Sequence, residues 1–267
     1  MFRTILIAGY GAMTGAMLEG WLASGMPPGT FTLYGPRAKP APAGVRFVTE
    51  PPGGVLDALV LGFKPQVLAE ATKPLGPLAG PDTTVVSVLA GVDLASLRRR
   101  FPHAGAIVRM MPNLAAALGK SATALVGEGL APAQHAAVND LAARLGTAEW
   151  LADERRFDLV AALAGSGPAF VYRFVDALAE GAARLGLDRE QAERLALATV
   201  EGAAALAAGS PLAPGALANK VASPGGMTER GLAVLDADEA LVRLIEQTLR
   251  AARDRGAEMA AAARTDG

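Results

Sequence analysis

Residues 3–15 read Arg-Thr-Ile-Leu-Ile-Ala-Gly-Tyr-Gly-Ala-Met-Thr-Gly, and the architecture expected of the whole chain follows from them. An apolar, β-prone run leads into a glycine turn, after which apolar residues recur at helical spacing. This order predicts a strand, a tight turn and a helix. Such a unit holds a dinucleotide pyrophosphate, because Gly9 permits the tight turn and Gly11 lets the backbone approach the phosphates.

The glycine fingerprint is imperfect at its third position. Thr14 stands where the third glycine is usual, and the glycine comes one residue later, at Gly15. A glycine motif alone is weak evidence for a nucleotide site. The strand before it and the amphipathic helix after it supply the context that the motif requires.

The end of the second expected strand, Thr30–Tyr34, bears on the choice of cofactor. A free ribose 2′-hydroxyl usually meets an acidic residue there, whereas a 2′-phosphate favours a small residue with Arg or Lys nearby. The chain continues Gly35-Pro36-Arg37-Ala38-Lys39, without a carboxylate. We therefore expect NADP(H) as the preferred cofactor and leave NAD(H) open. The alternative is that Arg37 and Lys39 are ordinary solvated charges.

Further strand-like runs alternate with helical patterns through the first half of the chain. A helix is expected to open at Lys64-Pro65-Gln66 and another to run from Asp93 to Arg100, with Arg98–Arg100 as a solvated face. Alternating strands and helices predict an α/β, Rossmann-like, doubly wound parallel sheet with its ligands at the carboxyl ends of the strands. The remaining strands expected are Val45–Val48, Leu56–Gly62, Thr83–Leu89, Ala106–Met110, Lys120–Val126 and Thr147–Leu151, with a helix at Pro132–Leu145.

Strand-like runs end near Asp153, and Ala/Leu-rich helical patterns take over. We therefore expect two domains, residues 1–152 and an all-α domain of residues 153–267. An all-helical half with this much apolar surface is a candidate for dimerisation, giving a homodimer or higher homo-oligomer. The alternative is that the surface packs within one chain. The helices expected are Arg155–Ala164, Pro168–Leu185, Asp188–Ala208 and Asp238–Ala263.

A second glycine turn lies inside the helical half, in Val221-Ala222-Ser223-Pro224-Gly225-Gly226-Met227-Thr228. The helix that follows aims its free N–H groups and positive dipole end into the turn, where a small carboxylate would sit well. The alternative is a plain helix cap, with Ser223 or Thr228 as the capping hydroxyl and Pro224 stiffening the entry.

Composition excludes several classes of function. The chain of 267 residues has no cysteine and two histidines, so thiolate chemistry, disulfides and a multi-histidine metal site are not expected. The net charge of −1 gives no sign of the basic surface that binding to nucleic acid requires. No apolar stretch is long enough for a membrane span, and no signal peptide is evident. We expect a cytoplasmic protein with a small-molecule partner, no metal, no nucleic acid and no membrane.

Five motifs together resemble the pyrroline-5-carboxylate reductases, which make proline. In chain order these motifs are Gly-x-Gly-x-Met at Gly9–Met13, Lys-Pro-Gln at Lys64–Gln66, Arg-x-Met-Pro-Asn at Arg109–Asn113, Gly-Ser-Gly-Pro-Ala at Gly165–Ala169 and Ser-Pro-Gly-Gly-x-Thr at Ser223–Thr228. The resemblance covers nearly the whole chain. Its last two motifs, taken together, are the most specific.

The resemblance implies an NAD(P)-binding domain, a helical domain that intertwines with its partner in a dimer, and NADPH-dependent reduction of 1-pyrroline-5-carboxylate to L-proline. It assigns the imine-facing hydroxyl to Thr228. It implies that the substrate carboxylate binds the turn Ser223–Thr228, beneath the nicotinamide. The substrate-binding residues expected are Lys220, Val221, Ser223, Gly225, Gly226, Met227 and Thr228. The cofactor contacts that it implies, with Arg37 added from the strand-end argument, are Gly9, Gly11, Ala12, Met13, Gly35, Arg37, Lys64, Pro65, Ala90, Gly91 and Glu154.

Several positions depart from the family pattern, and two alternatives follow. Four departures remove a hydroxyl, acidic or basic group around the expected pocket, and Lys220 puts a lysine where the family commonly has Asn; these changes bear on the substrate range more than on the reaction class. One alternative is a reductase of a different cyclic imine carboxylate, and the other is a non-catalytic NADP-binding module. The departing positions are Ala161, Ala164, Pro211, Ala218 and Lys220.

Overall fold

The computed structural model describes residues 1–265, with side chains up to residue 261, and divides into two compact units. The sheet unit joins Met1–Ser166 to the end of the chain from Ala251, and the helical unit is Gly167–Arg250. The sequence predicts one boundary near residue 152, whereas the compact units part after Ser166 and again after Arg250. The segment after residue 152 packs with the sheet because Phe157 is buried in its core.

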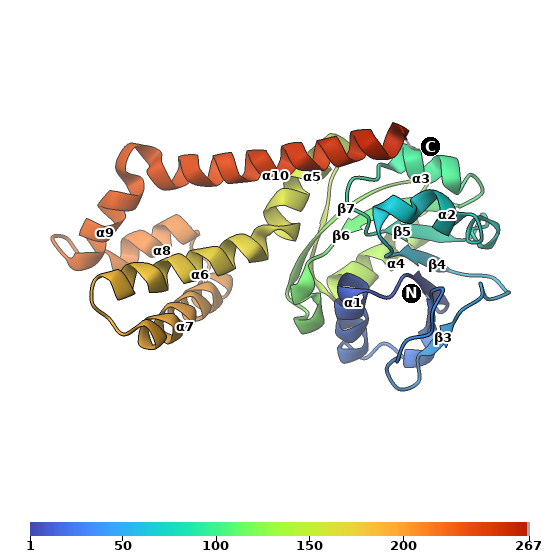
Figure 1. The fold of residues 1–267 in the computed structure, drawn as a ribbon, viewed down its shortest axis with the longest axis horizontal. Coiled ribbons are helices and arrows are strands. Elements are labelled where there is room, and N and C mark those ends of the chain that lie inside the picture. Colours follow the sequence, from blue (N-terminus) through green and yellow to red (C-terminus); the bar gives the residue numbers. More distant parts are fainter. Residues whose placement is uncertain (266–267) are drawn as a thin grey trace. The chain divides into compact units, whose positions relative to one another are not determined.

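The sheet unit contains an eight-stranded sheet of order β3-β2-β1-β4-β5-β6-β7-β8 (Figure 1). Neighbouring strands run parallel except β6 and β7, which are antiparallel. The predicted α/β fold with a Rossmann-like sheet is confirmed. The strands are β1 (Ile5–Ala8), β2 (Phe31–Tyr34), β3 (Arg46–Val48), β4 (Ala58–Leu61), β5 (Thr84–Ser87), β6 (Ala106–Met111), β7 (Ser121–Glu128) and β8 (Gly146–Trp150).

Each face of this sheet is covered by its own layer, so the central strands are apolar on both sides. In β1, Ile5 and Ile7 point into one core while Leu6 and Ala8 point into the other. Continuous apolar runs are what a parallel sheet buried on both faces requires. One layer holds α1 (Ala12–Ala23), η4 (Leu114–Leu118) and α4 (Pro132–Ala143), and the other holds α2 (Leu68–Thr72), α3 (Leu94–Arg100) and α5 (Phe157–Val160).

The predicted elements are present, with differences at their ends. Strands β2 to β5 are shorter than predicted because the flanking residues turn into loops, whereas β6 ends one residue and β7 two residues later than predicted, and β8 begins and ends one residue earlier. The predicted Lys64 helix starts as a 3₁₀ turn, η2 (Pro65–Val67), since Pro65 opens it. The expectation of a solvated face at Arg98–Arg100 is wrong for Arg98, whose Nε donates to Glu128 Oε1 at 2.7 Å and whose Nη1 donates to the Ala104 carbonyl.

Close packing of α1 on the sheet depends on two positions together, the larger Thr14 in α1 and the glycine opposite it, Gly62. Thr14 is buried, and its hydroxyl accepts from Gly11 N–H at 3.0 Å and donates to the Gly9 carbonyl at 2.8 Å. A Cβ added at Gly62 would lie 2.1 Å from Thr14 Cγ2. Gly62 therefore makes the room that a third glycine in the turn would otherwise make. Gly15 is not needed for packing, since its Cβ would meet only Tyr10, at 3.8 Å.

We expect Gly62→Ala to destabilise the sheet unit by about 1–3 kcal/mol, the usual cost of overpacking. Thr14→Ser removes the opposing methyl and keeps the hydroxyl, so the double variant Thr14→Ser/Gly62→Ala should regain at least half of the loss. Urea unfolding of the two single variants and the double variant measures this coupling. If the losses of unfolding free energy in the two single variants simply added in the double variant, the Thr14 methyl would not be what crowds a side chain at position 62.

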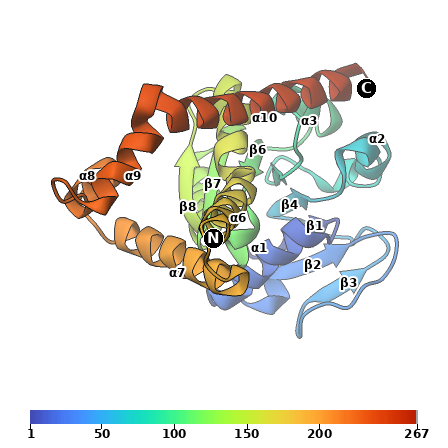
Figure 2. The same cartoon turned by 60° about the vertical axis from the view of Figure 1, so that its left-hand side comes forward.

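The helical unit is built from α6 (Gly167–Arg184), α7 (Arg189–Ala208), α8 (Pro214–Val221), α9 (Met227–Asp236) and the first part of α10 (Ala240–Thr265). Helices α6 and α7 form an antiparallel hairpin (Figure 2). Asp188 caps α7 by accepting from Gln191 N–H at 3.0 Å, and Gly186 ends the preceding helical segment at φ +105°. None of the described helices meets the length and apolarity that a membrane crossing needs.

Much apolar surface of the helical unit is uncovered in the single chain. Its buried core is small and consists of Ala179, Ala192 and Ala196. Large apolar side chains stand open, among them Tyr172 at 68%, Leu206 at 75% and Val234 at 72% exposure. Exposed apolar surface on this scale marks an interaction face rather than a finished monomer surface.

Candidate functional site

Residues predicted to bind a cofactor gather along one edge of the sheet. Four neighbouring strands end in register, at Tyr34 of β2, Ala8 of β1, Leu61 of β4 and Ser87 of β5. The segments after these four strands therefore open on the same edge, where ligands of parallel α/β sheets bind. The predicted residues on this edge are Gly9, Gly11, Ala12, Met13, Gly35, Arg37, Lys64, Pro65, Ala90 and Gly91.

The turn between β1 and α1 has the geometry of a phosphate cradle. Gly9 adopts φ +93°, and a Cβ there would lie 2.5 Å from the Phe63 backbone nitrogen. Gly11 is the N-cap of α1, and a Cβ added to it would meet no atom within 4 Å. The first glycine is thus required by the fold, while the second leaves open space in front of the helix N-terminus. An anionic ligand can approach the free amides there.

The loop after β2 is tied to the glycine turn by a lysine. Gly35 is buried and its N–H donates to the Val48 carbonyl at 3.2 Å. Beyond it, Lys39 Nζ donates to the Tyr10 carbonyl at 2.7 Å, and Arg37 is exposed. Lys39 is thus beside the glycine turn, and Arg37 lies two residues earlier in the same loop, which follows the strand end predicted to meet the ribose.

The buried cation Arg109 organises the neighbouring part of the edge. It projects from β6, is 4% exposed, and stacks on Phe157 with its guanidinium carbon 3.9 Å from the ring centroid. One amino group donates to Glu154 Oε1 at 2.7 Å, and the other lies 3.5 Å from Asp158 Oδ1. Glu154 Oε1 also accepts from the Leu94 N–H at 2.9 Å. Through one carboxylate oxygen, Arg109 is linked to the N-terminus of α3.

This arrangement gives Glu154 a positioning role toward the cofactor turn. Ala90 and Gly91 lie between β5 and α3, and the bond from Leu94 N–H to Glu154 fixes the start of α3 just after them. Asp153 anchors the same segment by accepting from Arg155 N–H. The Arg155 side-chain hydrogen bond holds the pKa of the Asp153 carboxyl below its usual range.

Asn113 holds the segment that follows. Its Nδ2 donates to the Ala164 carbonyl at 2.9 Å, and its N–H donates to Ser121 Oγ. The Ala164 carbonyl belongs to η6 (Ala161–Gly165), a π-helical turn where the sequence predicts plain α-helix. Such turns are frequent at functional sites. Arg109 and Asn113 come from one sequence motif, and both tie β6 to the chain that leads to Gly165.

A cavity of about 390 Å³ lies within the sheet unit at this edge. Its walls come from four places: Met13 of the glycine turn, the Ala90–Gly91 turn, the end of β6 and the segment from Asp158 to Ser166. The end of α10 supplies the remaining wall, at Ala252, Arg255, Gly256 and Met259. Apart from Asp158, Arg255 and Ser166 the lining is apolar, which suits the flat ring of a cofactor more than a free phosphate.

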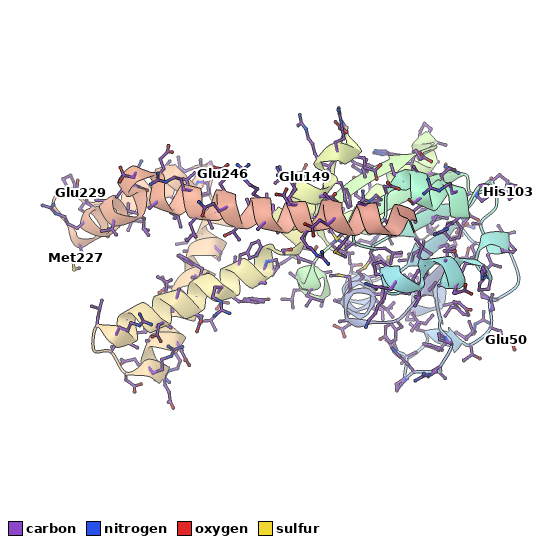
Figure 3. The ribbon with its side chains drawn as sticks, turned by 45° about the horizontal axis from the view of Figure 1, so that its top comes forward. Glu50, His103, Glu149, Met227, Glu229 and Glu246 are labelled. Atoms are coloured by element: carbon purple, nitrogen blue, oxygen red, sulfur yellow. The ribbon has the colours of Figure 1, made fainter. Side chains whose placement is uncertain are left out.

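The residues predicted to bind substrate lie together in the helical unit, at the junction of α8 and α9. Gly225 adopts φ +72°, and its N–H donates to Glu229 Oε2 at 2.7 Å. Gly226 is the N-cap of α9. The amides of Met227 and Thr228 stand in the first helical turn, where the helix has no carbonyl to accept from them. Figure 3 shows Met227 and Glu229 here, with the 94% exposed Met227 side chain directed into solvent.

The alternative reading of this turn as a hydroxyl cap is wrong. The N-cap is Gly226, and no side chain makes a capping hydrogen bond to α9. Ser223 contributes its backbone carbonyl, which accepts from Gly226 N–H at 2.9 Å. The hydroxyls of Ser223 and Thr228 are therefore free of a capping role, and a carboxylate, that of Glu229, already occupies one amide of the turn.

A glycine turn at the carboxyl edge of a parallel sheet, followed by a helical unit, defines an NAD(P)-binding oxidoreductase fold of the Rossmann type. Residues 154–259 match the family described as "Pyrroline-5-carboxylate reductase dimerisation". A pyrroline-5-carboxylate reductase of Pseudomonas aeruginosa is 35% identical over 264 residues, covering 96% of either chain. The chain belongs to the pyrroline-5-carboxylate reductase family.

Solved structures agree with this assignment. A pyrroline-5-carboxylate reductase from Coxiella burnetii is 29% identical and superposes with a TM-score of 0.89 over 96% of this chain and 98% of that one. Plasmodium falciparum pyrroline carboxylate reductase with NADP bound gives a TM-score of 0.80 at 22% identity, over 97% of this chain and 98% of that chain. At that identity the second structure shows a common fold alone.

We expect Glu154→Ala to destabilise the sheet unit by about 3 kcal/mol, because it leaves a buried guanidinium without its main partner. Glu154→Gln keeps an acceptor for the Leu94 N–H and should lose less. Thermal or urea unfolding measures both variants. The control is Glu149→Ala, at an exposed glutamate of β8 that Figure 3 also labels, and it should be neutral. Equal stability of the Glu154→Ala and control variants would contradict the role of the ion pair.

Proposed function

We propose that the protein reduces 1-pyrroline-5-carboxylate to L-proline with NADPH, the last step of proline biosynthesis. Membership of the family over 96% of the chain is the observation that carries the proposal. The α8–α9 turn supports it from the structure, since this turn presents backbone amides to a carboxylate and keeps the Thr228 hydroxyl free of any capping bond. Both features are what a cyclic imine carboxylate needs for binding.

The reaction adds a hydride to the imine carbon and a proton to the imine nitrogen. The dinucleotide supplies the hydride when bound, and the chain supplies position and electrostatics. Gly9, Gly11 and the Ala90–Gly91 turn would hold the dinucleotide along the sheet edge. A threonine hydroxyl is too weak an acid to release its proton near neutral pH, so the imine binds already protonated or is protonated through water. Thr228 then orients the nitrogen.

The substrate carboxylate is held by the first amides of α9. These N–H groups and the helix dipole favour a negative charge. In support, the N–H of Gly225, one residue before the N-cap of α9, already donates to a carboxylate oxygen, Glu229 Oε2, at 2.7 Å. The departures at Ala161, Ala164, Pro211, Ala218 and Lys220 leave this turn unchanged. Reduction of a six-membered cyclic imine carboxylate is the second candidate, because two of these positions, Ala161 and Ala164, lie in or beside the cavity of the sheet unit.

NADPH is the preferred reductant in this proposal. The active form is a homodimer assembled through the helical unit, and it is located in the cytoplasm. Lys39 beside the glycine turn and Arg37 in the same loop favour a 2′-phosphate, and no carboxylate directly follows β2 to bind a free 2′-hydroxyl. The uncovered apolar side chains of α6–α10 supply the area for a dimer. Only the small-molecule substrate and a second copy are needed as partners.

The direct test is NADPH oxidation by purified protein with 1-pyrroline-5-carboxylate, run beside NADH and beside the six-membered imine carboxylate. Substrate-dependent oxidation with the highest kcat/KM for NADPH and the five-membered ring is the expected result. A higher kcat/KM for the six-membered ring would favour the second candidate. NADPH binding without oxidation of either imine would make the chain a non-catalytic module.

We expect Arg37→Ala to raise the KM for NADPH about tenfold and to leave the KM for NADH unchanged, since one charge-assisted contact to the 2′-phosphate is lost. Steady-state kinetics with both cofactors measure the change. The control is Arg46→Ala, at an exposed arginine that begins β3 at the opposite end of the strands. A parallel rise in both KM values would contradict a phosphate contact.

We expect Thr228→Ala to lower kcat about ten- to a hundredfold, the value of one hydrogen bond to a partly charged group. Thr228→Ser retains the hydroxyl and should recover most of the rate. Single-turnover NADPH oxidation separates the chemical step from product release. Unchanged turnover in the alanine variant would remove Thr228 from the mechanism.

A further inference from the structure

The last turns of α10 belong to the sheet unit and lie directly on the predicted cofactor turn. Gly91 adopts φ +72°, and a Cβ added to it would lie 2.7 Å from Met259 Cβ and 3.2 Å from the Ala260 nitrogen. The end of α10 lies beside α3 in both Figure 1 and Figure 2. No motif of the sequence marks this stretch, and the sequence assigns it to the other domain.

A second contact fixes the rotation of this helix end. A Cβ at Gly256 would lie 3.4 Å from Asp158 Cβ, so the helix passes close to the carboxylate that flanks Arg109. Ala260 is buried, which makes it the residue that packs. Met259 is only half-buried and faces the cavity. The side chain next to the packing residue is therefore directed at the space where a ligand fits.

The cavity is lined by three thioethers from three separate elements. Met13 comes from the first turn of α1, Met111 from the end of β6 and Met259 from α10. Methionine side chains fit flat faces of different shape and make favourable sulfur contacts with aromatic rings. The surrounding residues are small, among them Ala90, Ala161 and Gly165. This lining suits a planar heteroaromatic ring that needs few hydrogen bonds.

We infer that Met259 is a cofactor-binding residue, which closes the cavity against the nicotinamide ring of the dinucleotide. The inference rests on the proposed use of NADPH and adds to it a wall from the C-terminal helix. In this binding mode the adenosine end of the dinucleotide would lie at the loop after β2, which contributes no residue to the cavity that Met259 lines. The contribution of Met259 is thus confined to the nicotinamide end of the cofactor.

Calorimetric titration of the full chain with NADPH and with 2′,5′-ADP, which lacks the nicotinamide end, tests the inference. Met259→Ala should raise the Kd for NADPH about five- to tenfold through lost apolar and sulfur contacts, and should leave the Kd for 2′,5′-ADP within about twofold. Met259→Leu keeps an apolar wall of similar volume and should stay within about threefold of the wild type for both ligands. The control is Asp254→Ala, at an exposed residue of the same helix end that pairs with Arg253.

The possible outcomes either support or overturn the role of Met259. An unchanged Kd for NADPH in Met259→Ala would overturn the inference, and so would an equal loss for both ligands, which would indicate general loosening of the sheet unit. A leucine variant as weak as the alanine variant would also overturn the role of an apolar wall. Met259-dependent NADPH binding without reduction of the imine would support the inference and overturn the proposed function alone. Wild-type protein that binds no NADPH would overturn both.

Discussion

Arg109 carries a positive charge into the core of the sheet unit, and the surrounding structure is arranged to hold it there. A buried guanidinium is costly unless its partners replace the lost water. Glu154, Asp158 and the ring of Phe157 do so from one short segment that follows the last strand. Because that segment is held by the ion pair, it packs with the sheet, and residues 153–166 join the first unit rather than the helical one.

The same ion pair links structure to function, because its acceptor oxygen is shared. Glu154 Oε1 receives one hydrogen bond from Arg109 and one from the N-terminus of α3. The turn before α3 is then fixed on one side by Glu154 and on the other by the end of α10, which rests on Gly91. Asn113 holds η6 in a similar way. The cavity is therefore bounded by segments that are distant in sequence, and two of them, the Ala90–Gly91 turn and residues 158–166, are held through Arg109 and Asn113.

The strands and the glycine turn could be predicted from the sequence, because they depend on residues that are close together in the chain. Apolar runs predict the strands, and Gly9 occupies the tight turn that its position predicts. What sequence could not predict depends on pairs of residues far apart in the chain. The exchange of bulk between Thr14 and Gly62 and the contact of Gly91 with Met259 both need the fold. Arg109 is a single charge in an otherwise apolar strand, which indicates a buried ion pair, but the sequence does not show which carboxylates pair with it. Periodicity predicts the α10 helix and cannot tell which unit its end packs on.

We propose that a dinucleotide binds along the sheet edge, over turns that the Arg109 ion pair and the end of α10 hold in place. Hydrogen–deuterium exchange of the full chain, with and without saturating NADPH, tests it most directly. Bound NADPH should slow exchange at Gly9–Gly15, in the loop after Tyr34, and from Ala90 to Leu94, with a smaller effect near Met259. Protection confined to α6–α9, or no protection at the glycine turn, would contradict it.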